Sequence, residues 1–165
     1  MKVKLFLNNI EVEADISEED LEKVMSNQKK TGYERVDDGQ VFYYDVDGTL
    51  ASHYDLHGDG EIDVGYNAAN YYSNEDVARN NIRADKLMRQ LRRFAVEHRK
   101  DAIDYNEGVY EITYDHEYNR LTVEAITWTK FFGAIPFDTK ETALLAVDTF
   151  RGELIWYFTE YKDSL

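Results

Sequence analysis

Apolar and polar residues alternate at residues 2–7 and again at residues 10–14, which is the pattern of two strands with one buried face each. Asn8 and Asn9 separate the two runs and tolerate the positive φ of a tight turn, so a hairpin is predicted. Ser17 and Asp20 then resemble a capping box at the start of a short helix that ends near residue 27. Residues 1–30 are therefore expected to form a small ββα N-terminal module, and the polar residues 28–40 to connect it to the rest.

The remaining residues, 40–165, show one pattern twice. In residues 41–99, two apolar runs flank an Asp47-Gly48 turn, a loop to about residue 65 leads to a short strand at 66–72, and residues 73–76 cap a long helix. In residues 109–161, strands at 109–115 and 120–128 flank a turn, a short strand follows at 133–137, and residues 138–141 cap a helix to about residue 150; a second helix begins after Gly152. The predicted fold class is α+β, with antiparallel sheets, helices packed on one face, and two tandem βββα-like units after the N-terminal module.

The long helix has apolar residues at spacings of three and four, as expected for one buried face. This predicted core stripe consists of Val77, Ala84, Leu87, Met88, Leu91, Phe94 and Ala95. The helix is expected to end near residue 99.

The charged residues are unevenly distributed along the chain, with a basic segment at residues 79–100 and an acidic remainder. There are 33 acidic and 19 basic side chains, which gives a net charge of −14, yet residues 79–100 carry eight bases and only two acids. The rest of the surface is therefore expected to repel nucleic acid and anionic membranes and to attract basic partners, although acidity also promotes solubility. The candidate partner-binding acids are Asp37, Asp38, Asp45, Asp47, Asp55, Asp59, Glu61 and Asp63.

The long helix supplies the candidate cations, which recur at helical spacing. They are Arg79, Arg83, Lys86, Arg89 and Arg93. Two interpretations stay open: these side chains contact RNA or an acidic partner, or they lie against the carboxylates of residues 34–63 of the same chain.

Asp45-Val46-Asp47-Gly48-Thr49 matches the nucleophile motif of haloacid dehalogenase-type phosphatases, in which the first Asp attacks phosphorus beside Mg²⁺. The matching second acidic motif follows after only about ten residues and no helix follows residue 50, so a simple hairpin turn is favoured. A magnesium-dependent phosphatase or nuclease that uses Asp45 and Asp47 is kept as an alternative.

The sequence from Asp55 to Tyr66 also resembles a calcium-binding loop, but Tyr66 occupies the position of the bidentate Glu ligand. A solvated acidic loop is therefore predicted. The four histidines lack zinc spacing and there is no Cys. No catalytic residue, metal or cofactor is expected. The chain also lacks the apolar run of a signal peptide or of a membrane span, so a cytoplasmic location is expected.

Residues 70–78, residues 135–143 and the tail 152–158 together give a resemblance that covers about residues 40–161. The chain resembles small accessory proteins carried by phages, prophages and plasmids of Firmicutes, some of which are anti-CRISPR inhibitors of Cas9. The resemblance implies a non-catalytic inhibitor in a bacterial host cell, with Cas9 or a Cas9–guide RNA complex as partner. No functional residue carries over from it.

In this interpretation the acidic surface mimics nucleic acid in the basic channel of the enzyme, and the basic helix is the candidate for contact with RNA. The alternative is a generic acidic interaction protein or an oligomeric accessory protein without such a target.

Overall fold

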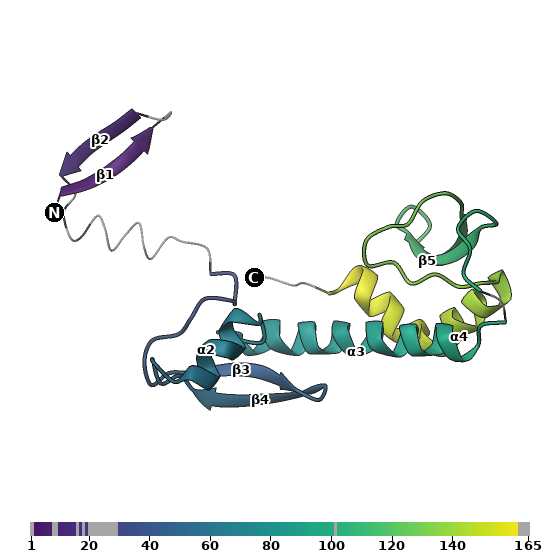
Figure 1. Ribbon diagram of the computed structural model, residues 1–165, viewed down its shortest axis with the longest axis horizontal. Helices are drawn as coiled ribbons and strands as arrows, with labels where there is room; N and C mark the ends of the chain where they lie inside the picture. Colours follow the sequence, from purple (N-terminus) through teal and green to yellow (C-terminus); the bar gives the residue numbers. More distant parts are fainter. Residues whose placement is uncertain are drawn as a thin grey trace. The chain divides into compact units, whose positions relative to one another are not determined.

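The computed structural model describes residues 2–7, 10–15, 17, 19, 30–100 and 102–161. The chain divides into two compact units, Met1–Thr31 together with Leu165, and Gly32–Ser164. Each unit is described by itself, with the labels of Figure 1.

The first unit contains one antiparallel hairpin. Strand β1 (Lys2–Leu7) pairs with β2 (Ile10–Asp15), in a register that runs from Lys2 opposite Asp15 to Leu7 opposite Ile10. The predicted hairpin is therefore confirmed. The turn at residues 8–9 and the predicted helix to residue 27 lie outside the described residues, except Ser17 and Glu19.

The second unit begins with another hairpin, formed by β3 (Val41–Val46) and β4 (Thr49–Tyr54). Asp47 and Gly48 connect the strands with φ of 55° and 81°, and positive φ at both positions is what the favoured two-residue hairpin turn requires. The prediction of a hairpin turn at this motif is confirmed.

A helix, α2 (Gly60–Asn67), replaces the end of the predicted loop to residue 65 and the first two residues of the predicted strand at 66–72. The Asp59 carboxylate accepts a hydrogen bond from the N–H of Glu61 and so caps this helix. Gly60 and Gly65 lower the intrinsic helix propensity of the segment, which explains why the sequence did not indicate a helix. Only Tyr72 remains of the predicted strand: it forms an isolated antiparallel bridge with Tyr43, with N···O distances of 2.8 and 2.9 Å.

The long helix is confirmed as α3 (Glu75–Glu97), and the Asn74 side chain caps it by accepting from the N–H of Val77. Six residues of the predicted stripe are buried, whereas Met88 is half-buried. Ala78 and Ile82 are also buried and were not predicted.

The second half of this unit repeats the arrangement. Strands β5 (Val109–Asp115) and β6 (Arg120–Ile126) form a hairpin, and Phe137 bridges to Tyr110 with N···O distances of 2.9 and 2.8 Å. Thr139 then caps α4 (Lys140–Thr159). α4 consists of two helical segments that meet at a kink at Phe150, whose φ of −110° and ψ of 17° are not helical, so the prediction of a helix to about residue 150 and a second helix after it is confirmed.

In both halves, a bridging aromatic residue precedes the helix cap by two positions: Tyr72 precedes Asn74, and Phe137 precedes Thr139.

The described residues contain three separate two-stranded antiparallel sheets, and the α+β class is confirmed. Strands β3 and β4 contact α3, whereas β5 and β6 contact α4, which lies against α3 (Figure 1). Among the described residues, no helix combines the length and apolar composition that a membrane span needs.

The apolar core is uneven. The main cluster contains nine buried residues, among them Leu87, Leu91, Phe137 and Leu154, and joins the C-terminal part of α3 to Phe137 and α4. The first half has two clusters of three buried residues each, one around Phe42 and the other around Val77.

Candidate functional site

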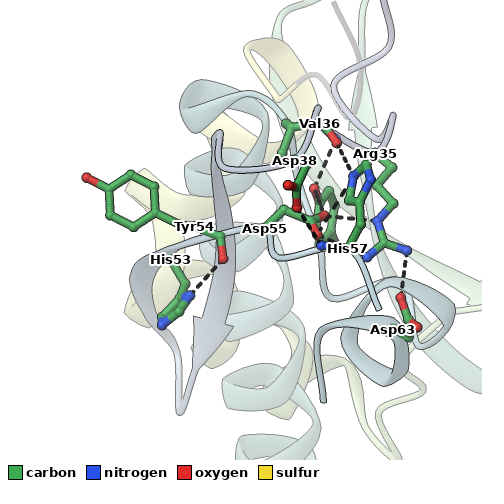
Figure 2. A network of polar contacts seen from close by, with 9 residues as sticks. Arg35, Val36, Asp38, His53, Tyr54, Asp55, His57 and Asp63 are labelled. Atoms are coloured by element: carbon green, nitrogen blue, oxygen red, sulfur yellow. Dashed lines mark hydrogen bonds and ion pairs between the residues drawn. The ribbon is translucent and has the colours of Figure 1, made fainter. Parts of the chain in front are cut away.

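A polar network centres on Asp55, directly after β4 (Figure 2). Arg35 donates to both carboxylate oxygens of Asp55, from Nε at 2.9 Å and from Nη2 at 3.0 Å, and its Nη1 donates to Asp63 Oδ1 at 2.6 Å. The side chain of Asp55 has no exposed surface. This paired guanidinium holds the pKa of Asp55 below its ordinary value, although burial opposes the shift.

Tyr71 completes the network. Its hydroxyl donates to Asp55 Oδ2 at 2.7 Å and accepts from the N–H of Val36 at 3.0 Å. Burial is the main reason that the pKa of Tyr71 is raised to about 12. Backbone bonds between Gly39, Gln40 and Asp55 fasten the same segments together, so the network holds residues 35–40 against residues 55–63.

His57 joins these two segments from the exposed side (Figure 2). Its N–H donates to Asp38 Oδ1 at 2.8 Å, and its Nε2 lies 3.0 Å from the carbonyl oxygen of Val36 and 3.9 Å from Asp55 Oδ1. The hydrogen-bonding capacity of Asp55 is used by neighbours within the fold. The network is therefore a structural connection between loops.

The prediction of a solvated acidic loop is wrong at Asp55, because that carboxylate is buried and ion-paired. It is also wrong from residue 60 onward, where α2 replaces the loop; Asp59, which caps this helix, is exposed as predicted. In the part of the chain that the structure describes, no group of three or more His, Cys, Asp or Glu side chains is placed to hold a metal ion.

Asp45 and Asp47, the residues of the phosphatase-like motif, lie at the β3–β4 turn. Asp45 Oδ1 accepts from the N–H of Gly48 at 2.6 Å, and its Oδ2 lies 3.7 Å from Arg89 Nη2. The backbone of Asp45 also exchanges two hydrogen bonds with the amide of Asn70. The Asp45 carboxylate thus stabilises the turn, as Asp side chains commonly do.

The structure does not bring the eight candidate acids to one surface. Asp55 is buried and cannot present its carboxylate to a partner, which corrects the prediction for this residue. Asp63 pairs with Arg35 and Asp45 with Arg89. The other five form no ion pair with a described residue: Asp47 at the turn, and a group that we term the acidic cluster, Asp37, Asp38, Asp59 and Glu61.

The hydrogen bond between His57 and Asp38 joins the two segments that carry the acidic cluster. All four of its side chains are exposed.

Most of the candidate cations of α3 pair with acids outside residues 34–63. Arg79 pairs with Glu75 and Arg93 with Glu97, each within the helix. Arg83 forms a bidentate pair with Glu153 at 2.7 and 3.0 Å and lies over the Trp156 ring, 3.9 Å from its centroid. Of these cations, only Arg89 forms an ion pair within residues 34–63, with Asp45. Lys86 has no ion pair among the described residues. The prediction that these cations pair with the carboxylates of residues 34–63 therefore holds for one of the five, Arg89.

The loop after β6 carries exposed aromatic side chains that the sequence interpretation missed. Trp128 is 77% exposed, with φ of 62°, and Phe131 and Phe132 are also exposed. We term these three residues the aromatic loop. Beside it lies an open groove of about 450 Å³, lined by Ile103, Ile135 and other apolar residues and by three cations without an ion pair to a described residue, Arg92, Arg99 and Lys130. The run Trp-Thr-Lys-Phe-Phe was the available signal, but its first residue, Trp128, was assigned to the predicted strand 120–128, whereas β6 ends at Ile126.

Comparison of the chain with protein-family models, with curated proteins and with solved structures found no match in any of the three. The predicted resemblance to anti-CRISPR proteins stays a prediction, and the surfaces are interpreted from their geometry.

Proposed function

We propose that this protein is a non-catalytic binding protein that presents its acidic cluster to the nucleic-acid-binding surface of a partner enzyme. The observation that carries this proposal is the lack of ion pairs: Asp37, Asp38, Asp59 and Glu61 are exposed and form no ion pair with a described residue. In a chain of net charge −14, such a surface favours fast, salt-sensitive association with a basic groove. A host defence enzyme such as Cas9 provides a groove of this kind.

In this proposal the partner recognises negatively charged side chains that are held at fixed positions. Asp59 is fixed by its cap on α2, and Asp38 by the N–H of His57, while the Arg35–Asp55 network anchors both segments. Pre-organised carboxylates lose less conformational entropy on binding than those on a floppy loop.

The test measures binding to a purified Cas9–guide RNA complex by biolayer interferometry over a range of salt concentrations, together with inhibition of DNA cleavage. The variant is the triple change Asp37→Asn, Asp38→Asn and Glu61→Gln, which leaves the Asp59 cap intact. We expect it to weaken binding by at least about tenfold and to flatten the salt dependence. The matched control, Glu107→Gln, Glu117→Gln and Glu124→Gln, removes the same charge from exposed acids of the second half and should bind as the unaltered protein does.

No binding and undiminished cleavage would refute the proposal. Equal loss in both triple variants would show that only total charge matters, and would refute the role of the acidic cluster.

A second candidate function is attachment to another protein, or to a second copy of this chain, through the aromatic loop. Large exposed aromatic side chains beside arginines are typical of interface centres. Light scattering after size-exclusion chromatography tests self-association: Phe132→Ser should shift an oligomer toward monomer, and a concentration-independent monomer would rule out the second-copy form of this candidate.

A further inference from the structure

A cavity of about 180 Å³ lies where α3 and α4 meet β5 and residues 133–137. Its walls are mainly apolar and include Met88, Leu91, Leu154, Tyr157 and Phe158. The volume is close to the roughly 150 Å³ of an apolar cavity that holds benzene. One charged residue, Glu111, belongs to the lining.

Glu111 lies in β5 and is 7% exposed. Its Oε1 accepts no hydrogen bond, and it forms no ion pair with a described residue. Loss of hydration raises the pKa of the Glu111 carboxyl. Glu124, directly opposite in the hairpin, is exposed, so burial distinguishes the two acids.

A buried carboxyl oxygen without a partner is costly, and native folds rarely keep one without a reason. Tyr105, whose hydroxyl is also buried without a hydrogen-bond partner, is close enough to Glu111 for the carboxylate to contribute to its raised pKa. The fold thus places a buried acid that has an unpaired oxygen among the residues lining an apolar cavity large enough for a small organic group.

The chemistry of the walls selects the ligand. An anion would be repelled by Glu111, and a strongly polar neutral molecule would leave its own polar groups unpaired against Leu91 and Leu154. An ammonium group would form a charge-assisted hydrogen bond with the carboxylate, and the rings of Tyr157 and Phe158 favour a cation beside them. A short alkyl or aryl body would fill the apolar remainder.

We propose that this cavity binds a primary ammonium group on a small apolar body, with Glu111 as its counter-ion. Free amines and the side chain of a lysine in a partner protein share this chemistry. The proposal does not depend on the acidic cluster, which belongs to the first half of the unit, so either can fail without the other.

The test is a titration of the full chain, followed by isothermal calorimetry and by NMR chemical shifts. The probes are phenethylamine and n-butylamine, the neutral analogue 2-phenylethanol, the anionic analogue 3-phenylpropionate, and N-acetyl-lysine methylamide. We expect phenethylamine to bind at least about tenfold more tightly than 2-phenylethanol, and 3-phenylpropionate not to bind. Glu111→Gln, which is nearly isosteric, should abolish the preference for the amine, whereas Glu124→Gln should keep it.

Tighter binding of N-acetyl-lysine methylamide than of the free amines would support the site and identify a lysine side chain as its source. A second variant, Met88→Trp, fills the cavity from the half-buried position on α3 and should block every probe if Glu111→Gln proves unfolded. The proposal is overturned if the amine and the alcohol bind equally, if Glu111→Gln binds the amine unchanged, or if no amine binds and ordered water alone satisfies Glu111.

Discussion

Asp55→Asn tests whether the central carboxylate of the polar network is structural. Both Asp55 oxygens accept hydrogen bonds, one from Arg35 alone and one from Arg35 and Tyr71 together. The amide of an asparagine keeps one acceptor but turns the other oxygen into an NH₂ donor, which would face donors already in place. The substitution also removes the negative charge that pairs with the guanidinium.

The expected loss follows from these contacts. A hydrogen bond to a charged group contributes about 1.5–3 kcal/mol, and removing one partner from a buried pair costs more than the pair's net contribution. Because the Arg35 side chain is 28% exposed, water can solvate part of the freed guanidinium. We therefore expect the free energy of unfolding of the second unit to fall by about 2–3 kcal/mol, equivalent to a decrease in Tm of about 10 °C.

Urea denaturation followed by far-ultraviolet circular dichroism measures this change, with Asp47→Asn as the matched control. Asp47 is exposed and has φ of 55°, a conformation that asparagine tolerates, so its substitution should change the free energy by less than about 0.5 kcal/mol. Equal stability of the two variants would refute the structural role of Asp55.

The same network predicts a dependence on pH. The pKa of Asp55 is lower in the folded state than its ordinary value of 3.8, so its stabilising contribution is present above that value and is lost as the pH falls through the lower folded pKa. The difference in stability between the unaltered protein and Asp55→Asn should shrink over this acid range. A difference that stays constant would contradict the assignment.

Four further substitutions test the fold. Asn74→Ala and Thr139→Ala each remove a helix cap at an equivalent position, and each should lower the free energy of unfolding by about 1 kcal/mol in urea titrations; restoring the cap with Ser should recover most of it. Gly32→Ala should cost at least about 2 kcal/mol, because Gly32 has φ of 90° and a Cβ there would lie 2.7 Å from Val77 Cγ2. On the alkaline side, the raised pKa of Tyr71 means that its contribution is full below about pH 10 and is lost as the pH rises to about 12, which Tyr71→Phe should abolish in circular dichroism titrations.

Those elements that the sequence predicted correctly depend on local signals. Asp47-Gly48 can adopt positive φ whatever surrounds it, and a side-chain cap such as Asn74 or Thr139 acts on an N–H only three residues away. The hairpins and the two long helices followed from such signals. Helix α2 did not, because its two glycines weaken the local preference and its formation depends on burial of Ile62 in the core.

The candidate site could be predicted only in part, because the composition gives the number of charged residues but not which of them form ion pairs. Arg35 is the single base among nine acids in residues 34–63, and this composition marks it as the partner of one of them. Which acid it meets is set by contacts across 20 and 28 residues, to Asp55 and Asp63. Likewise, the pairing of Arg83 with Glu153 spans 70 residues and has no local signal.

The two halves of the second unit share a scaffold but differ in what stabilises it. The second half packs against the C-terminal part of α3 in one apolar cluster of nine buried residues, whereas the rest of the first half has two clusters of three and an ion-paired carboxylate between its loops. A small apolar core contributes little free energy, so the first half depends more on Arg35 and Asp55. Neutralising Asp55 would therefore disturb the loops that carry the acidic cluster and weaken binding for a structural reason. Asp37, Asp38 and Glu61 are the positions at which a loss of binding can be attributed to the surface itself.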